Sequence, residues 1–220
     1  MAKEILTPLQ QKFIGLLSKN KHLKERFYLT GGTALAAYYL NHRYSEDLDF
    51  FSLKQVEPLL ITSFLKSIKN KLGIIKTDYQ QSFNRNLFFL HAKSGILKTE
   101  FTFFPFEQSE KPLNKDGISI DSVSDIATNK AFTILQNPRA RDFIDLYCIL
   151  QKRKDLSFSG LLKSARIKFD SQIDPIQLGA QLVKAKNISD LPRMVVRLDE
   201  HKWRSFFIDQ AKLLSSRIFK

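Results

Sequence analysis

Apolar and polar residues alternate with two different periods along this 220-residue chain. Leu9, Phe13, Ile14 and Leu17 recur at three- and four-residue spacing, which predicts an amphipathic helix over residues 8–17. Short apolar runs or period-two alternation predict strands, and longer stretches with helical spacing predict two further helices. The predicted strands cover residues 27–29, 48–51, 73–75, 86–92, 96–104 and 117–120, and these helices cover 33–40 and 57–72. The first half is therefore predicted to be mixed α and β.

Only helical patterns follow residue 121. Apolar positions at helical spacing predict helices over 122–136, 139–151, 159–169, 175–186 and 200–218. We therefore expect an α+β chain with two domains, a mixed sheet with flanking helices over residues 1–120 and a helical domain over 121–220. The length is sufficient for two lobes with a core of apolar side chains.

Charge and cysteine content narrow the functional classes. The formal net charge is +13, from 35 Lys and Arg against 22 Asp and Glu, which favours polyanionic partners such as nucleic acid. The bland alternative is a basic surface that only keeps the protein in solution. A single cysteine, Cys148, excludes an intramolecular disulfide and fits a reducing cytoplasm. No apolar run reaches the length of a signal peptide or a membrane span, so a cytoplasmic protein without a membrane partner is expected.

The segment from Phe27 to Phe51 carries the chemistry. Asp47 and Asp49 project from the same face of a predicted strand, where two carboxylates repel each other unless a cation lies between them. Magnesium suits such a position, because it binds one or two carboxylates together with substrate phosphates. The Gly31-Gly32 pair supplies a tight turn whose backbone amides can approach a phosphate at the start of a helix. The combination indicates nucleotide chemistry.

Gly31-Gly32-Thr33, Arg43-x-Ser45 and Asp47-x-Asp49, in this order, resemble the AbiEii/AbiGii-type toxin family, a branch of the DNA polymerase β-like nucleotidyltransferases. The resemblance implies the polymerase β-like fold, NTP as substrate and two Mg²⁺ ions. It also implies that the Gly-Gly-Thr element binds the β- and γ-phosphates. Arg43 and Ser45 are expected to contact phosphate or to orient the aspartates, and the alternative is a plain polar loop.

A third carboxylate of such a site is expected on a neighbouring strand. Lys98 and Glu100 share one face of the predicted strand 96–104, while Phe101 and Phe103 point to the other. By resemblance, Lys98 lies in the nucleotide site and Glu100 joins Asp47 and Asp49 as a catalytic metal ligand. The family usually has Asp at this third position, and an exposed strand face is the alternative interpretation of Glu100.

The resemblance extends into the helical half, to about Leu150. Lys130 is followed by Asp142 and Asp145 at i and i+3 of a predicted helix, the succession that the family shows. The resemblance implies that Lys130 reaches nucleotide phosphates and that Asp142 or Asp145 binds base, ribose or a basic neighbour. The alternative is a structural ion pair of Asp142 or Asp145 with Arg139, Arg141 or Lys130.

These features predict a magnesium-dependent nucleotidyltransferase that moves a nucleoside monophosphate to an acceptor, with RNA such as a tRNA 3′ end expected. The family implies the toxin of a toxin–antitoxin pair, and thus a cognate antitoxin as partner. Two alternatives stay open: a nucleic-acid-binding module with this fold but no activity, and transfer to a protein or a small molecule. Scattered histidines disfavour a zinc site, and the sequence lacks a Walker loop and a Gly-x-Ser-x-Gly elbow.

Overall fold

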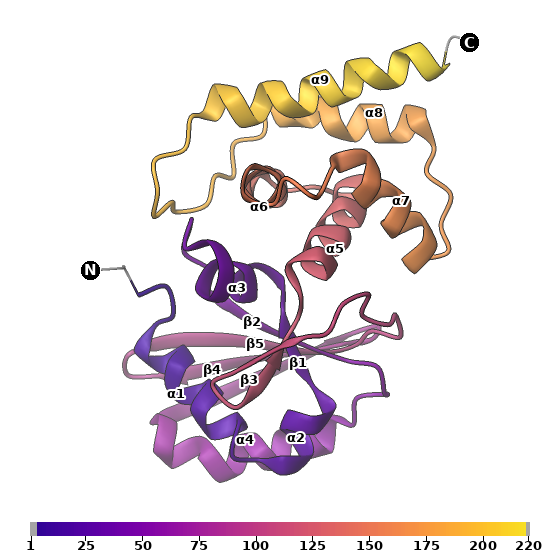
Figure 1. The fold of residues 1–220 in the computed structure, drawn as a ribbon. Coiled ribbons are helices and arrows are strands. Elements are labelled where there is room, and N and C mark those ends of the chain that lie inside the picture. Colours follow the sequence, from indigo (N-terminus) through magenta and orange to yellow (C-terminus); the bar gives the residue numbers. More distant parts are fainter. Residues whose placement is uncertain (1–3, 219–220) are drawn as a thin grey trace. The chain divides into compact units, whose positions relative to one another are not determined.

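A computed structural model describes residues 4–218 and divides the chain into two compact units, Met1–Ser122 and Val123–Lys220. The first is α+β, with a sheet and helices, as Figure 1 shows. Its elements are α1 (Pro8–Leu17), α2 (Lys21–Arg26), β1 (Tyr28–Thr30), α3 (Gly31–Leu35), the π-helix η1 (Ala36–Leu40), β2 (Asp47–Ser52), α4 (Pro58–Leu72), β3 (Ile74–Ser82), β4 (Arg85–Ala92), β5 (Gly95–Phe103), β6 (Leu113–Lys115) and β7 (Ile118–Ile120).

The sheet is mixed, with the strand order β3-β4-β5-β2-β1-β7-β6. β2 runs antiparallel to β1 and parallel to β5, and β1 runs parallel to β7. The remaining pairs, β3–β4, β4–β5 and β6–β7, are antiparallel. β2 therefore lies in the middle of the sheet, where both of its edges are hydrogen-bonded to neighbouring strands.

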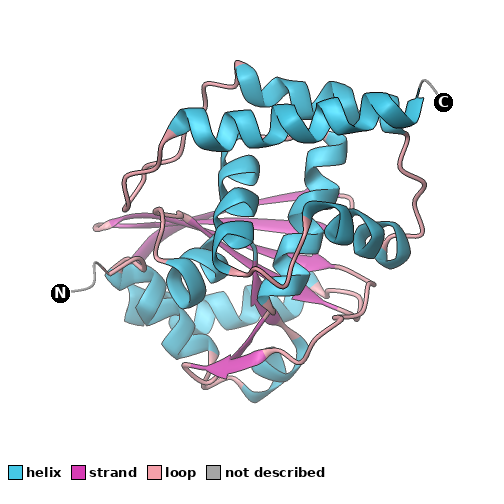
Figure 2. Cartoon of the chain, turned by 45° about the horizontal axis from the view of Figure 1, so that its top comes forward, coloured by secondary structure: helices cyan, strands magenta, loops and turns pink. Residues whose placement is uncertain are grey.

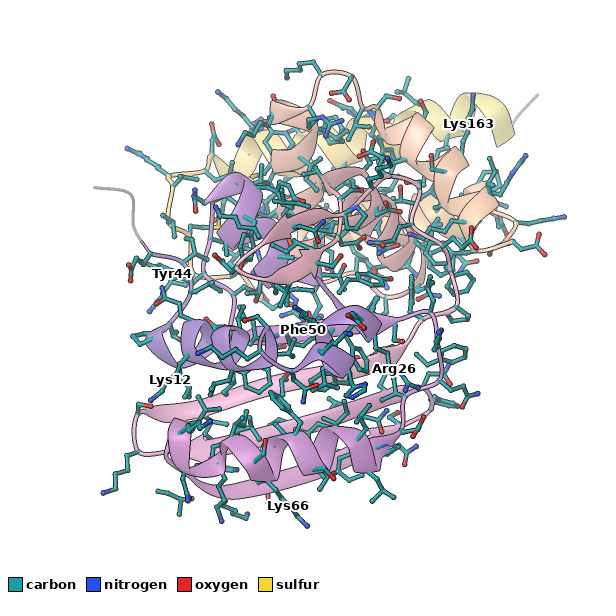
Figure 3. The ribbon with its side chains drawn as sticks, turned by 60° about the horizontal axis from the view of Figure 1, so that its bottom comes forward. Lys12, Arg26, Tyr44, Phe50, Lys66 and Lys163 are labelled. Carbon is teal, nitrogen blue, oxygen red and sulfur yellow. The ribbon has the colours of Figure 1, made fainter. Side chains whose placement is uncertain are left out.

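One face of this sheet forms the core of the first unit. Leu48 and Phe50 of β2 are fully buried, and Phe50 stacks on Phe101 of β5 with ring centroids 5.2 Å apart. Phe13 of α1 contacts Phe50 and also Phe64 of α4. Figure 3 shows Phe50 on the inner side of α1, whereas Lys12 and Lys66 project outward. Since side chains alternate along a strand, the residues on either side of Leu48 point to the opposite face.

Local sequence signals set the ends of the two long helices that cover this core. Thr7 caps α1 in a reciprocal capping box with Gln10, and Pro8 occupies the first helical turn. α4 also begins with a proline, Pro58, and ends at Gly73 in the left-handed conformation. Such signals explain why both helices begin and end close to the predicted residues.

Within its described residues, 123–218, the second unit is built from helices joined by loops, and Figure 2 colours these helices cyan. Phe143, Trp203 and Phe207 are fully buried and form its aromatic core, with the rings of Phe143 and Phe207 4.8 Å apart. The helices are α5 (Val123–Gln136), α6 (Ala140–Lys152), α7 (Phe158–Lys168), α8 (Pro175–Val183), the 3₁₀ helix η2 (Lys184–Lys186) and α9 (Glu200–Ile218). None of the helices within residues 4–218 is both long enough and apolar enough to cross a membrane.

Three features differ from the sequence-based expectation. α2 has six residues of which only Leu23 is buried, so it carries no periodic signal. β6 is short and exposed along its whole length. β3 extends to Ser82 although most of it is exposed, and its residues are polar on both faces. Pairing with β4, not burial of its own side chains, holds this strand in the sheet.

Candidate active site

The pairing of β1 with β2 brings the Gly-Gly turn to the Asp-x-Asp strand. Thr30, the last residue of β1, lies opposite Asp49. Gly31 follows with φ +73°, a conformation that residues with a side chain rarely adopt. A Cβ atom at Gly31 would lie 2.5 Å from Oδ2 of Asp49. The absence of a side chain at residue 31 therefore leaves the space that the Asp49 carboxylate occupies.

Gly32 lies in a second close approach, to the two polar residues that precede β2. A Cβ atom there would overlap Nη2 of Arg43 and would lie 3.1 Å from Oγ of Ser45. Arg43 is only 2% exposed, and its Nη1 donates a hydrogen bond to the Tyr44 carbonyl at 2.9 Å. The structure thus brings Arg43 and Ser45 to the glycine turn, although the contacts alone do not assign a phosphate to them.

Thr33 links the turn to the acidic strand. Its side chain is fully buried, and its hydroxyl donates a hydrogen bond to the main-chain carbonyl of Asp47. This bond ties the start of β2 to α3. Phosphate binding through the Thr33 hydroxyl stays a prediction, and in the structure that hydroxyl has a positioning role.

The carboxylates lie on the sheet face opposite the Phe50 core. Asp47 and Asp49 are partly exposed, while Leu48 and Phe50 between and after them are buried. The parallel register places Lys98 beside Asp47 and Glu100 beside Asp49. Nζ of Lys98 binds Oδ2 of Asp47 at 2.8 Å. The residues predicted from the two strand motifs, Asp47-x-Asp49 and Lys98-x-Glu100, are therefore neighbours on one face.

Glu100 has a different partner from the one expected. Its side chain is buried, and both of its oxygens bind Arg85 of β4, at 2.7 Å to Nε and 2.6 Å to Nη2. Thr102 donates a further hydrogen bond to Oε1 at 2.6 Å. The Glu100 hydrogen bond is the main cause that raises the pKa of Arg85, which keeps its guanidinium charged. Arg85 was not predicted from the sequence, because it belongs to no motif and is a single charged residue at the start of β4.

These contacts decide which residues fit a magnesium ion. Within residues 4–218, no group of three or more His, Cys, Asp or Glu side chains is arranged to hold a metal. Glu100 accepts two hydrogen bonds from Arg85 and one from Thr102. Asp47 and Asp49 offer partly exposed carboxylate oxygens on one face, which is the donor chemistry that Mg²⁺ prefers. The donor set on this face thus fits through Asp47 and Asp49, and the ligand role of Glu100 stays a prediction.

In the helical unit, Lys130 lies between the two predicted aspartates. Its Nζ is 3.1 Å from Oδ1 of Asp142 and 2.7 Å from Oδ2 of Asp145, and all three side chains are buried. Oδ2 of Asp142 also accepts a hydrogen bond from the Arg139 amide at the start of α6. The structural ion pair considered as the alternative is present, and the nucleotide contacts of these residues stay predictions.

Two residues that sequence reasoning did not select hold the turn in place. Asp121 is fully buried; Oδ2 accepts from the Thr30 hydroxyl at 2.7 Å, and Oδ1 accepts from Gln108 at 2.6 Å. Nε2 of Gln10 donates to the carbonyls of Ser45 and Glu46, just before β2. Asp121 directly follows the buried strand β7, which pairs with β1. This position after a buried strand was the signal in the sequence that could have identified Asp121.

The chain is similar to several known proteins. The profile of the family described as "Nucleotidyl transferase AbiEii toxin, Type IV TA system" matches residues 15–216. The chain is 36% identical over 127 residues to the uncharacterized protein aq_aa25 of Aquifex aeolicus (strain VF5). That match covers 57% of this chain and 58% of the curated relative, so it spans little more than half of the relative's length.

Two crystal structures share the fold. JHP933 from Helicobacter pylori superposes with a TM-score of 0.57 at 23% identity, over 95% of this chain and 90% of that one. A putative nucleotidyltransferase from H. pylori gives a TM-score of 0.57 at 22% identity, over 95% and 92%. Together with the glycine turn beside Asp47-x-Asp49, the profile match over most of the length shows that this chain belongs to the family of AbiEii nucleotidyl transferase toxins of type IV toxin–antitoxin systems.

Proposed function

We propose that this chain transfers a nucleoside monophosphate from an NTP to an acceptor at the Asp47–Asp49 face. One observation carries the proposal: Gly31, in a conformation that suits glycine, packs against the Asp49 carboxylate at the start of a helix. A turn of this kind offers bare backbone amides to phosphate oxygens. Backbone amides bind phosphates and carboxylates bind a divalent cation. The two kinds of group together therefore suit an NTP that carries a divalent cation.

Within this proposal each residue has a defined task. The amides around Gly31 and Gly32 bind the phosphates of the NTP, and the buried Arg43 holds the turn from behind. Asp47 and Asp49 hold magnesium, which when bound neutralises the charge of the phosphates and the carboxylates. Lys98 shields Asp47, at 2.8 Å, until substrate arrives. The fixed positions of these groups reduce the reorganisation required for transfer.

RNA is the proposed acceptor, with a tRNA 3′ end as the first candidate. The net charge of +13 favours a polyanion, and the helical unit exposes Lys163, Arg166, Lys184 and Lys186. Lys168, which the sequence alone groups with them, is instead buried in an ion pair with Asp125. Membership of a type IV toxin–antitoxin family supports a toxin role and a cognate antitoxin as a further partner.

The acceptor is identified by label transfer. The protein is incubated with each α-labelled NTP, Mg²⁺ and either total RNA or total protein, and the labelled product is separated. We expect one NTP to label RNA of tRNA size. Label on protein would replace the RNA acceptor, and label on neither, with small molecules also present, would contradict transferase activity.

A further inference from the structure

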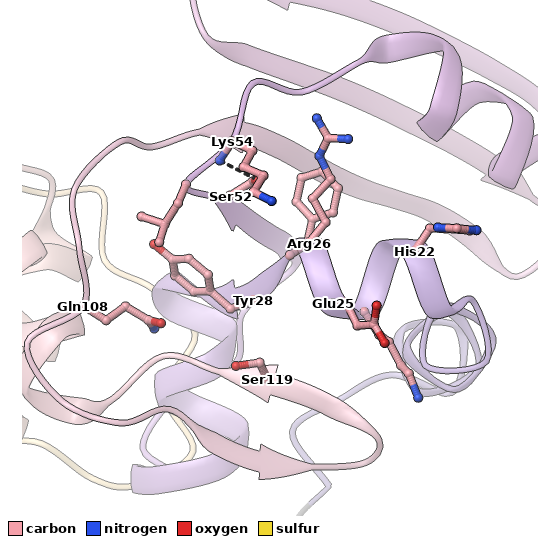
Figure 4. A pocket seen from close by; sticks show the side chains of 11 residues that line it. His22, Glu25, Arg26, Tyr28, Ser52, Lys54, Gln108 and Ser119 are labelled. Atoms are coloured by element: carbon pink, nitrogen blue, oxygen red, sulfur yellow. Dashed lines mark hydrogen bonds between the residues drawn. The ribbon is translucent and has the colours of Figure 1, made fainter.

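The first unit contains a cavity away from the glycine turn. It has a volume of about 430 Å³ and lies where β1 begins and β2 ends, next to α2. Figure 4 shows Arg26 and Lys54 near Ser52, with Tyr28 and Ser119 on neighbouring strands. Because β1 and β2 are antiparallel, Asp47 lies at the other end of β2, about 17 Å away along a six-residue strand. The cavity is thus separate from the Asp47–Asp49 face.

Its lining is basic. His22, Lys24, Arg26 and Lys54 contribute to the wall, against a single acidic residue, Glu25. Lys24 and Lys54 are exposed. The Arg26 guanidinium contacts Glu57 at 3.3 Å and the Gln55 carbonyl, whereas its buried Nε has no hydrogen-bond partner among the described residues. The cations Lys24, Arg26 and Lys54 outnumber the acidic neighbours Glu25 and Glu57, and this excess of positive charge favours an anion in the cavity.

Aromatic rings lie beside the basic cavity. Tyr28 contributes to the cavity wall, and its ring contacts Phe51, with centroids 6.2 Å apart. Phe51 contacts Phe104 at 4.6 Å, and Phe104 contacts Phe106 at 5.0 Å. Phe51 shares a face of β2 with Asp47 and Asp49, since these positions differ by two residues each. The three phenylalanine rings are partly exposed.

We infer that this cavity binds backbone phosphates of the single-stranded acceptor, whose bases stack on the neighbouring aromatic rings. Proteins that bind single-stranded nucleic acid without sequence preference combine two features. Cationic side chains contact the phosphates of the nucleic-acid backbone, and neighbouring aromatic side chains stack on bases of any type. The inference rests on the proposed function, because it takes the acceptor to be RNA. It adds the place where the acceptor is held before its end reaches Asp47 and Asp49.

The test uses the whole chain and removes two exposed cations. In the cavity variant, Lys24→Ala is combined with Lys54→Ala. The control variant combines Lys66→Ala with Lys69→Ala, which removes the same charge from exposed positions of α4 outside the cavity. Binding of a labelled 12-nucleotide single-stranded RNA is followed by fluorescence anisotropy at several salt concentrations, without NTP or Mg²⁺. Phe106→Ala probes stacking.

We expect the cavity variant to bind about tenfold more weakly at low salt, with the slope of log affinity against log salt reduced by about 1.4, since each phosphate contact contributes about 0.7. Phe106→Ala should weaken binding about tenfold with the slope unchanged. Equal slopes for the cavity and control variants would overturn the inference. A wild-type protein that does not bind the RNA would overturn it as well.

These outcomes are separable from failure of the proposed function. Binding is measured without NTP, so it does not depend on transfer. Loss of RNA binding only in the cavity variant, together with a wild type that transfers no label, would contradict the transferase and leave the RNA site. Transfer to a protein acceptor, with no RNA binding, would contradict the RNA site and leave the transferase.

Discussion

Arg85 and Glu100 form the tightest charge pair on the carboxylate face. The guanidinium uses Nε and Nη2 toward Glu100, and its side chain is 53% exposed while that of Glu100 is 6% exposed. Nη1 makes no hydrogen bond within the described residues. The Arg85 guanidinium therefore stabilises the fold through its hydrogen bonds to Glu100. Its exposed edge also places a positive charge beside Asp49.

Replacement of Arg85 should therefore destabilise the fold. Arg85→Ala leaves a buried carboxylate with only the Thr102 hydroxyl, and we expect a loss of about 1–3 kcal/mol in the free energy of unfolding. Urea denaturation at pH 7 measures it, with Lys93→Ala of the exposed β4–β5 turn as control. A loss no larger than that of the control would contradict a structural role for this pair.

The glycine turn gives a second prediction at this scale. Gly31→Ala places a methyl group in the left-handed region and against Asp49, so unfolding free energy should fall by about 1–3 kcal/mol. Gly15→Ala, on α1 with open space around its Cβ position, should be neutral or stabilise by up to about 1 kcal/mol. Thermal unfolding compares the two variants. Equal effects would show that the close approach at residue 31 is unimportant.

Side-chain chemistry explains which residues the sequence revealed. Asp47 and Asp49 stand in a buried strand, where two carboxylates are unusual enough to be noticed. Asp121, Gln10 and Arg85 are polar residues in ordinary surroundings. The pairing of β7 with β1 and of β4 with β5 shows what Asp121 and Arg85 contact. The contacts of Gln10 depend on the position of α1 beside the segment that precedes β2. Contacts between residues far apart in sequence depend on which strands pair and in which register. The identity of a single residue does not reveal this register.

At the scale of elements, the π-helix η1 is attached to the β6–β7 turn through Tyr38. Its phenol donates a hydrogen bond to Asp116 at 2.9 Å, and Nζ of Lys115 lies 5.7 Å from the ring centroid. Burial, together with the Asp116 hydrogen bond and charge, raises the pKa of Tyr38 above its ordinary value. The folded state therefore retains this proton more strongly than the unfolded state does.

This difference predicts a dependence of stability on pH. Below about pH 10, where tyrosine is protonated in the unfolded chain, the contribution of Tyr38 is fully present. As the pH rises further, the unfolded state loses the proton first and the contribution declines. The difference in unfolding free energy between wild type and Tyr38→Phe should thus shrink between pH 9 and 11. A difference that is constant over this range would contradict the assignment.

Elements with a periodic apolar face were predicted well, and those without one were not. The expected helix over 8–17 and the strand around 48–51 have buried residues at regular spacing and are present as α1 and β2. α2, with one buried residue, and the exposed β6 lack that spacing. The helix predicted over 33–40 forms, but it begins at Gly31 and continues as a π-helix, because the glycine turn itself enters the helix.

At the scale of the whole molecule, not every basic residue contributes to the basic surface, because some are held in ion pairs with buried aspartates. Lys168 is 8% exposed and binds the fully buried Asp125 at 2.8 Å, whereas Lys163 on the same helix is exposed. Two lysines five residues apart on α7 therefore have different roles. A net charge counted from the sequence includes both.

We expect Lys168→Ala to lower the unfolding free energy by about 3–5 kcal/mol, because it removes the ammonium group that binds the buried Asp125 carboxylate. Lys163→Ala should leave stability within about 0.5 kcal/mol and, if the acceptor is RNA, reduce the salt slope of RNA binding by about 0.7. Denaturation and anisotropy measure the two effects. Comparable stability of both variants would contradict the buried ion pair.

Asp47 and Asp49 are the residues on which the proposed nucleotidyl transfer depends. The most direct test of this dependence is incorporation of α-labelled NTP by wild type, Asp47→Asn and Asp49→Asn, with Mg²⁺ and with the ion removed by EDTA. We predict incorporation by wild type with Mg²⁺ only. Both variants should be folded but inactive, because Asn keeps the size of Asp and the strand keeps its buried Leu48 and Phe50. Near wild-type turnover by either variant, or full activity in EDTA, would contradict this dependence.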